Sequence, residues 1–247
     1  MYLLKSWREA RLSVAIFAVP IVFILYNLLR HAPAQMATTS HASTEWLATR
    51  GLSISGVLLL FVAWSLGGDG IGQDIAEDRG AFMLTRPRTR RFFVWSDSGF
   101  SFGLMAALAW GMTLLFALMI LVHVIELPPG MSLSPLVLLL IPLSGLVFAG
   151  LIYGVTYLCT MLIPRHNTAR IISVAVLIGY TYLHFKSRGW EGVAHNLFPG
   201  WWVDPFPYQY SSAAAPHVWL ELGARVIAIV VLLLAAQFVL ERREIRA

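Results

Sequence analysis

The residues best suited to binding or catalysis lie in one charged stretch, residues 68–97, which we call the first loop. Asp74, Glu77 and Asp78 come first, and a run of arginines follows. Asp74 and Glu77 stand one helical turn apart, where two carboxylates can hold a cation. No histidine joins them, however, and the nearby arginines repel cations. The pattern therefore favours recognition of a partner over metal binding.

Groups for covalent catalysis are sparse. Ser144 and His184 come nearest to the pair of a membrane serine protease, but Pro142 stands where the first glycine of the Gly-x-Ser-Gly turn belongs. The chain has no Walker A motif, so it does not bind ATP by that route. Its single cysteine, Cys159, excludes an intrachain disulfide and a multi-cysteine zinc site. We expect no enzyme and no cofactor in this chain.

The composition is that of an integral membrane protein. Of 247 residues, 58% are hydrophobic and 13% are charged, whereas soluble domains carry about 25% charged residues. The length suits a single all-α transmembrane domain over residues 1–247. The net charge of +5 does not indicate nucleic-acid binding, because the basic residues gather at the ends of apolar segments.

Six apolar segments are long enough, or nearly so, to form transmembrane helices. They are residues 12–29, 52–67, 100–124, 133–163, 171–185 and 226–240. The fourth contains Pro135 and Pro142, which predict a kink or a broken start. As delimited, none contains Asp, Glu, Lys or Arg. Because ion-driven transporters usually keep such groups within the membrane, we expect any uphill transport to draw energy from another protein.

The basic residues set the predicted orientation. With the N-terminus inside, 13 of the 18 Lys and Arg residues face the cytoplasm, as the positive-inside rule requires. Six spans then place both termini in the cytoplasm. We expect the protein in the plasma (inner) membrane. An alternative is a cleaved signal sequence ending at Ala32-Pro33-Ala34, which would leave five spans.

Two further segments are expected to lie at the membrane surface. Residues 1–13 form an amphipathic pattern that predicts an interfacial helix, with Trp7 at headgroup level and Arg8 on its basic face. Residues 186–225 form an outer loop rich in Trp, Tyr and Pro. This composition predicts a re-entrant or interfacial segment, acting either as an outer gate or as an anchor.

The first loop predicts a short amphipathic helix near residues 74–84. Ile75, Arg79 and Phe82 share one face at helical spacing, and Pro87 ends or kinks the helix. Anionic lipid headgroups would attract the arginines but repel the preceding acids. A protein partner of mixed charge accounts for both halves of the loop.

The chain resembles the permease subunits of ABC-2-type transporters. The resemblance rests on Glu77 and Gly80, on the Leu84-Thr85-Arg86-Pro87 run with Arg90, and on the arrangement of an interfacial helix before six spans. It implies that the loop is a coupling helix docking on a separate ATP-binding subunit, with ATP and Mg²⁺ bound there. It also implies a second permease chain, identical or different, and the export of a cargo. The implied contact residues are Asp74, Ile75, Glu77, Asp78, Arg79, Gly80, Phe82, Leu84, Arg86, Pro87 and Arg90.

Polar groups within the spans are candidates for a substrate path, and they are Tyr153, Tyr157, Tyr180 and Gln237. Small-residue stripes at Gly150/Gly154 and at Gly103/Ala107/Gly111 predict close helix packing, within the chain or with a second chain. Two alternatives to a permease stay open. One is a membrane anchor or assembly factor that recruits a cytoplasmic protein, and the other is a membrane-embedded enzyme.

Overall fold

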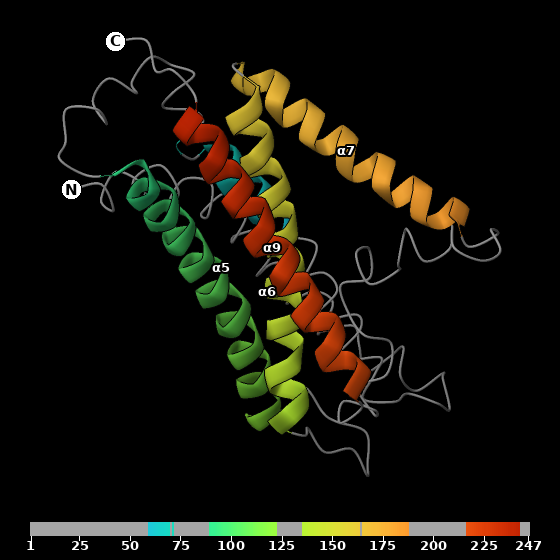
Figure 1. The fold of residues 1–247 in the computed structure, drawn as a ribbon. Coiled ribbons are helices and arrows are strands. Elements are labelled where there is room, and N and C mark those ends of the chain that lie inside the picture. The colour runs from blue at the N-terminus through green and yellow to red at the C-terminus, as the bar shows by residue number, and fades with distance from the viewer. Residues whose placement is uncertain are drawn as a thin grey trace.

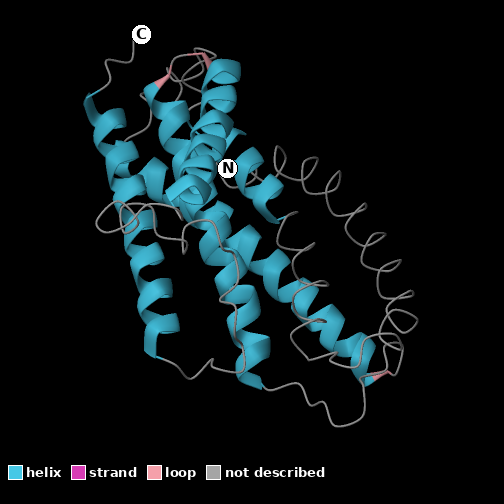
Figure 2. Ribbon diagram, turned by 90° about the vertical axis from the view of Figure 1, so that its right-hand side faces the viewer, coloured by secondary structure: helices cyan, strands magenta, loops and turns pink. Residues whose placement is uncertain are grey.

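The protein is all-helical over the part of the chain that the computed structural model describes, residues 59–69, 71, 89–122, 135–163, 165–187 and 216–242. The helices are α5 (Arg90–Leu121), α6 (Pro135–Leu162), α7 (His166–Ser187) and α9 (Pro216–Arg242), with a shorter apolar helix at Leu59–Asp69 (Figure 1). Figure 2 shows that all regular secondary structure in these described segments is helical. The all-α prediction is thus confirmed for them.

Several predicted elements lie outside the described residues. They are the interfacial helix with Trp7 and Arg8, the first span, the coupling residues from Asp74 to Pro87, and the outer loop before Pro216.

Local chemistry explains where three helices begin. Thr89 caps α5, since the Phe92 amide donates to the Thr89 carbonyl at 3.0 Å and to its Oγ1 at 3.4 Å. Pro135 and Pro216 are the first residues of α6 and α9. A proline suits that position, because its fixed φ is already helical and its missing N–H would have no partner there.

Three helices are long and apolar enough to cross a membrane, at Arg90–Leu115, Pro142–Leu162 and Leu222–Arg242. Their exposed side chains include Leu114, Leu115 and Ile227. Such surface suits lipid and would be costly in water. These findings fit a membrane protein. The helix containing the predicted fifth span, α7, is not among the three, and the helix at the predicted second span is the short Leu59–Asp69.

Helix α6 is the central element. It packs against α5, α7 and α9, while α5 and α9 also contact each other. Its spanning part is 67% buried, against 28% for each of the other two spans. Gly150 and Gly154 permit this packing, because a Cβ on Gly150 would lie 2.8 Å from the side chains of Phe102 and Ile229. This small-residue stripe therefore serves contacts within one chain.

Two helices begin earlier than their apolar segments. Helix α5 starts at Arg90, so residues 90–97, which the sequence assigned to the first loop, are its first two turns. Helix α9 starts at Pro216, ten residues before the predicted span and inside the predicted outer loop. Backbone hydrogen bonding continues through polar residues, whereas an apolar segment stops at them. Helix α6, by contrast, matches its predicted segment and continues through Pro142.

The helices alternate in direction, so the start of α5 and the ends of α6 and α9 lie together (Figure 1). We call this the arginine end of the bundle. Its described basic residues are Arg90, Arg91, Arg165, Arg170 and Arg242.

Candidate functional site at the arginine end of the bundle

The end of the first loop is joined to α9. Arg90 is the first residue of α5, and its Nη1 donates to the carbonyl oxygens of Leu240 at 3.1 Å and Glu241 at 3.2 Å. These carbonyls belong to the last turn of α9, where no further helical amide is available to them. A cation is also favourable at a helix C-terminus. Arg90, expected from the resemblance to contact an ATPase, thus binds α9 in this conformation.

A second set of contacts joins the same two helices. Arg91 Nε lies 2.7 Å from Glu241 Oε1, and that oxygen also accepts from Gln237 Nε2 at 3.0 Å. Trp95 Nε1 donates to Gln237 Oε1 at 2.9 Å. We call these residues, with Arg90, the exit cluster. Gln237, a candidate for the substrate path, here uses both atoms of its amide to connect α5 with α9.

The exit cluster contributes more to the relative position of α5 and α9 than to the stability of the fold. The Arg91 and Glu241 side chains are 68% and 31% exposed, and exposed ion pairs add little to stability because water and salt screen them. The Arg90 contacts are partly buried, which makes them less sensitive to screening by salt. The cluster therefore fixes where α5 begins relative to the end of α9.

The start of the first loop is held by a different set of residues, the entrance cluster. Asp69 forms an ion pair with Arg170 of α7 and accepts from Ser65 Oγ at 3.1 Å. Two residues later, the Ile71 amide donates to Asp97 Oδ2 of α5 at 3.4 Å. Ile71 and Asp97 are both buried. The loop thus leaves the bundle from a point joined to α5 and α7.

Hydroxyl groups lie where α6 packs against α5 and against the helix Leu59–Asp69. Tyr153 and Tyr157 are fully buried and stack with ring centroids 5.3 Å apart. The Tyr153 hydroxyl donates to Ser98 Oγ at 3.4 Å, and Thr160 Oγ1 donates to the Gly67 carbonyl at 3.4 Å. Both tyrosines proposed for a substrate path are therefore packed away from solvent in this conformation. The Tyr180 side chain lies outside the described residues.

Two charged side chains within the spans were missed by the sequence analysis. Asp97 in α5 and Arg225 in α9 are 5% and 2% exposed, and both lie inside helices able to cross a membrane. The predicted segments began at residues 100 and 226 and so left both positions out, whereas α5 and α9 begin earlier and include them. A helical signal was present for Asp97, since Val94, Ser101 and Met105 share its buried face at spacings of three and four residues.

Other candidate chemistry gains little support. Ser144, the possible nucleophile, is 1% exposed. Among the described residues, no group of three or more His, Cys, Asp or Glu side chains could hold a metal ion. The described contacts attach both ends of the first loop to α5, α7 and α9.

No known protein family model, curated protein or solved structure matches this chain.

Proposed function

We propose that this chain is the membrane-spanning permease subunit of an ATP-driven ABC transporter of the ABC-2 type, acting as an exporter. It would form the cargo path and dock a separate ATP-binding subunit through the first loop. ATP and Mg²⁺ would bind on that subunit, and this chain would contribute no cofactor site. In this proposal the protein resides in the plasma (inner) membrane with both termini in the cytoplasm.

The observation that carries the proposal is the attachment of the first loop at both ends. Its entrance contacts α5 and α7 through Asp97 and Arg170, and its exit contacts α9 through Arg90. A partner that pushes on such a loop would displace several helices together. This is the form of coupling that a transporter driven by an external ATPase needs, since helices can switch as rigid bodies around a shared path.

The charge distribution supports the side on which the partner would bind. The described arginines concentrate at the arginine end, while Arg225 lies near the start of α9 at the opposite end. Under the positive-inside rule the arginine end faces the cytoplasm. An ATP-binding subunit in the cytoplasm would then meet the first loop directly.

The proposal includes a second permease chain, and α5 offers a surface for it. Gly99, Gly103, Ala107 and Gly111 recur every four residues and are exposed. A Cβ on any of the three glycines would meet nothing within 4 Å. Small residues let membrane helices approach closely, so this stripe suits a helix of another chain.

Co-purification of the tagged chain from its native membrane in mild detergent tests the proposal. A stoichiometric ATP-binding protein should accompany the wild type and be lost on Glu77→Ala. The variant Arg90→Ala should retain that protein, because Arg90 contacts α9, yet should alter its ATP hydrolysis. Arg165→Gln is the matched control, since Arg165 is an exposed arginine outside both clusters.

A chain that purifies alone in several mild detergents would contradict the transporter proposal. A different cytoplasmic protein, without ATP-binding capacity, would favour the anchor or assembly factor instead.

A further inference from the structure

Helix α7 is attached to the rest of the described structure mainly through its first turns. Among the labelled helices it packs against α6, and Figure 1 shows it diverging from α6 along its length. Ala169 and Ser173 are fully buried near its start. Farther along, Val176 and Ile178 are 48% and 63% exposed. Among the contacts of the described residues, those near residues 169–173 therefore hold the direction of α7.

Three interactions meet at this base. Arg170 forms an ion pair with Asp69, and its guanidinium carbon lies 5.4 Å from the centroid of the Trp64 ring. The Trp64 Nε1 donates to Ser173 Oγ at 3.2 Å, and that hydroxyl donates to the Arg170 carbonyl at 2.8 Å. The planar guanidinium of arginine can pair with a carboxylate and stack on a ring at the same time. We call Trp64, Asp69, Arg170 and Ser173 the α7 link.

The α7 link lies directly beside the start of the first loop. Asp69 is the last residue of the helix Leu59–Asp69, and the Ile71 amide, two residues on, is bonded to Asp97. Any displacement of the loop that moves Asp69 must also move Arg170 or break their ion pair. The partial burial of the pair, with side chains 31% and 24% exposed, protects it from full competition by water.

We propose that the α7 link sets the angle of α7 and transmits movement at the start of the first loop to that helix. This inference rests on the proposed function, in which the loop receives the push of an ATPase. Within it, Arg170 is a positioning residue. The chemistry that performs the step is an Arg–carboxylate pair stacked on an indole ring, and it needs no ligand.

The expected motion is large enough to measure. Ile178 lies 13 residues beyond Arg165, which is about 20 Å along a helix. A change of about 20° in the angle of α7, pivoting at Arg165, would move Ile178 by roughly 7 Å, given that helix length. Both Ile178 and Leu114 of α5 are more than 60% exposed, so each can carry a spin label.

The experiment is a distance measurement between nitroxide labels by pulsed electron paramagnetic resonance on the full chain in lipid nanodiscs. The background carries Cys159→Ala, with Ile178→Cys and Leu114→Cys for labelling. We expect a narrow distribution in this background. Asp69→Asn and Arg170→Gln should each broaden it or shift it by several ångströms, on the scale of the roughly 7 Å displacement above. Arg165→Gln should leave it unchanged.

A conservative variant separates the link from general damage. Arg170→Lys keeps the positive charge but loses the planar fork, so its distribution should lie between those of the background and Arg170→Gln. Only variants that elute as single species in gel filtration are compared. Unchanged distributions in Asp69→Asn and Arg170→Gln would overturn the proposal, as would a lysine variant no narrower than the glutamine variant.

The measurement uses neither an ATP-binding subunit nor nucleotide. Failure of the co-purification described above would therefore contradict the proposed function without affecting this result. Conversely, unchanged distance distributions would contradict the role proposed for the α7 link but would not contradict the permease proposal.

Discussion

Replacement of Gly67 by alanine is the most direct test of how the helix Leu59–Asp69 packs on α6. A Cβ at this position would lie 2.9 Å from the backbone oxygen of Tyr153 and 3.0 Å from Cβ of Thr156. Neither atom is the end of a flexible side chain. The added methyl group can therefore be accommodated only if one helix moves away from the other.

The matched variant is Gly223→Ala in α9, because a Cβ on Gly223 would meet nothing within 4 Å. Both changes replace a helical glycine by alanine and gain the same intrinsic helix preference, up to about 1 kcal/mol. The difference between the two variants in the free energy of unfolding then isolates the cost of overpacking, which is about 1–3 kcal/mol. In the unfolding equilibrium constant this is roughly a 5- to 150-fold change.

The assay is equilibrium unfolding in mixed detergent micelles, followed by intrinsic fluorescence and by retention in gel filtration. Gly67→Ala should unfold at a lower denaturing-detergent fraction than Gly223→Ala. Equal midpoints would refute the reasoning, because they would mean that the helix at residues 59–69 does not contact α6 closely at Gly67.

Three further outcomes are expected. Gly150→Ala should be less destabilising than Gly67→Ala in the same titration, since the atoms it meets are side-chain ends that can shift; an equal or larger loss would contradict this. Trp95→Phe removes the hydrogen bond to Gln237 and should cost at most about 0.5–1.5 kcal/mol, with a double-mutant cycle against Gln237→Leu showing coupling. Gly103→Leu should reduce the recovery of one tagged copy by another without lowering the unfolding midpoint, if the α5 stripe packs on a second chain. Undiminished recovery would show that the stripe is not part of such an interface.

The sequence was most informative where apolar residues alone define a helix. The segment predicted at residues 133–163 corresponds to Pro135–Leu162, because it is mostly apolar and no charged residue interrupts it. Helices α5 and α9 extend ten residues farther than predicted at their N-terminal ends. There the helix passes through charged residues, and a search for apolar runs stops at them.

The contacts of the candidate site could not be predicted in the same way. Arg90 binds the carbonyl of Leu240, 150 residues away in the chain, and sequence spacing carries no signal for such a pair. The sequence did indicate that Gly150 and Gly154 permit close packing, but it left open whether the neighbour is in the same chain. The answer depends on α9 and on Phe102 of α5, whose positions follow from the packing of the whole bundle.

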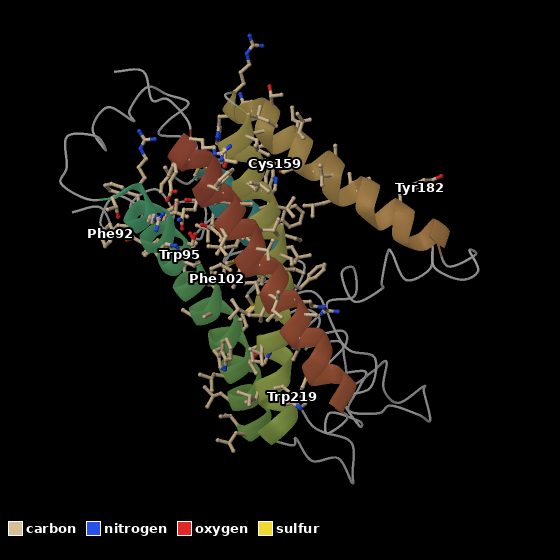
Figure 3. The ribbon with its side chains drawn as sticks, viewed as in Figure 1. Phe92, Trp95, Phe102, Cys159, Tyr182 and Trp219 are labelled. Carbon is tan, nitrogen blue, oxygen red and sulfur yellow. The ribbon has the colours of Figure 1, made fainter. Side chains whose placement is uncertain are left out.

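The aromatic residues of α9 relate the buried charges to the membrane. Trp219 and Phe238 are both about half exposed and lie near opposite ends of the helix, and Figure 3 shows Trp219 far from Trp95. Nineteen residues separate them, which is about 28 Å along a helix, close to the roughly 30 Å of a bilayer core. If these rings mark the two interfaces, Arg225 lies about 9 Å inside the one at Trp219, whereas Asp97, two residues beyond Trp95, stays near the arginine end. A charge at the depth of Arg225 is costly unless protein surrounds it, and its 2% exposure meets that condition. The two missed charges therefore differ in role: Asp97 belongs to the attachment of the first loop, while Arg225 belongs to the membrane interior of the bundle.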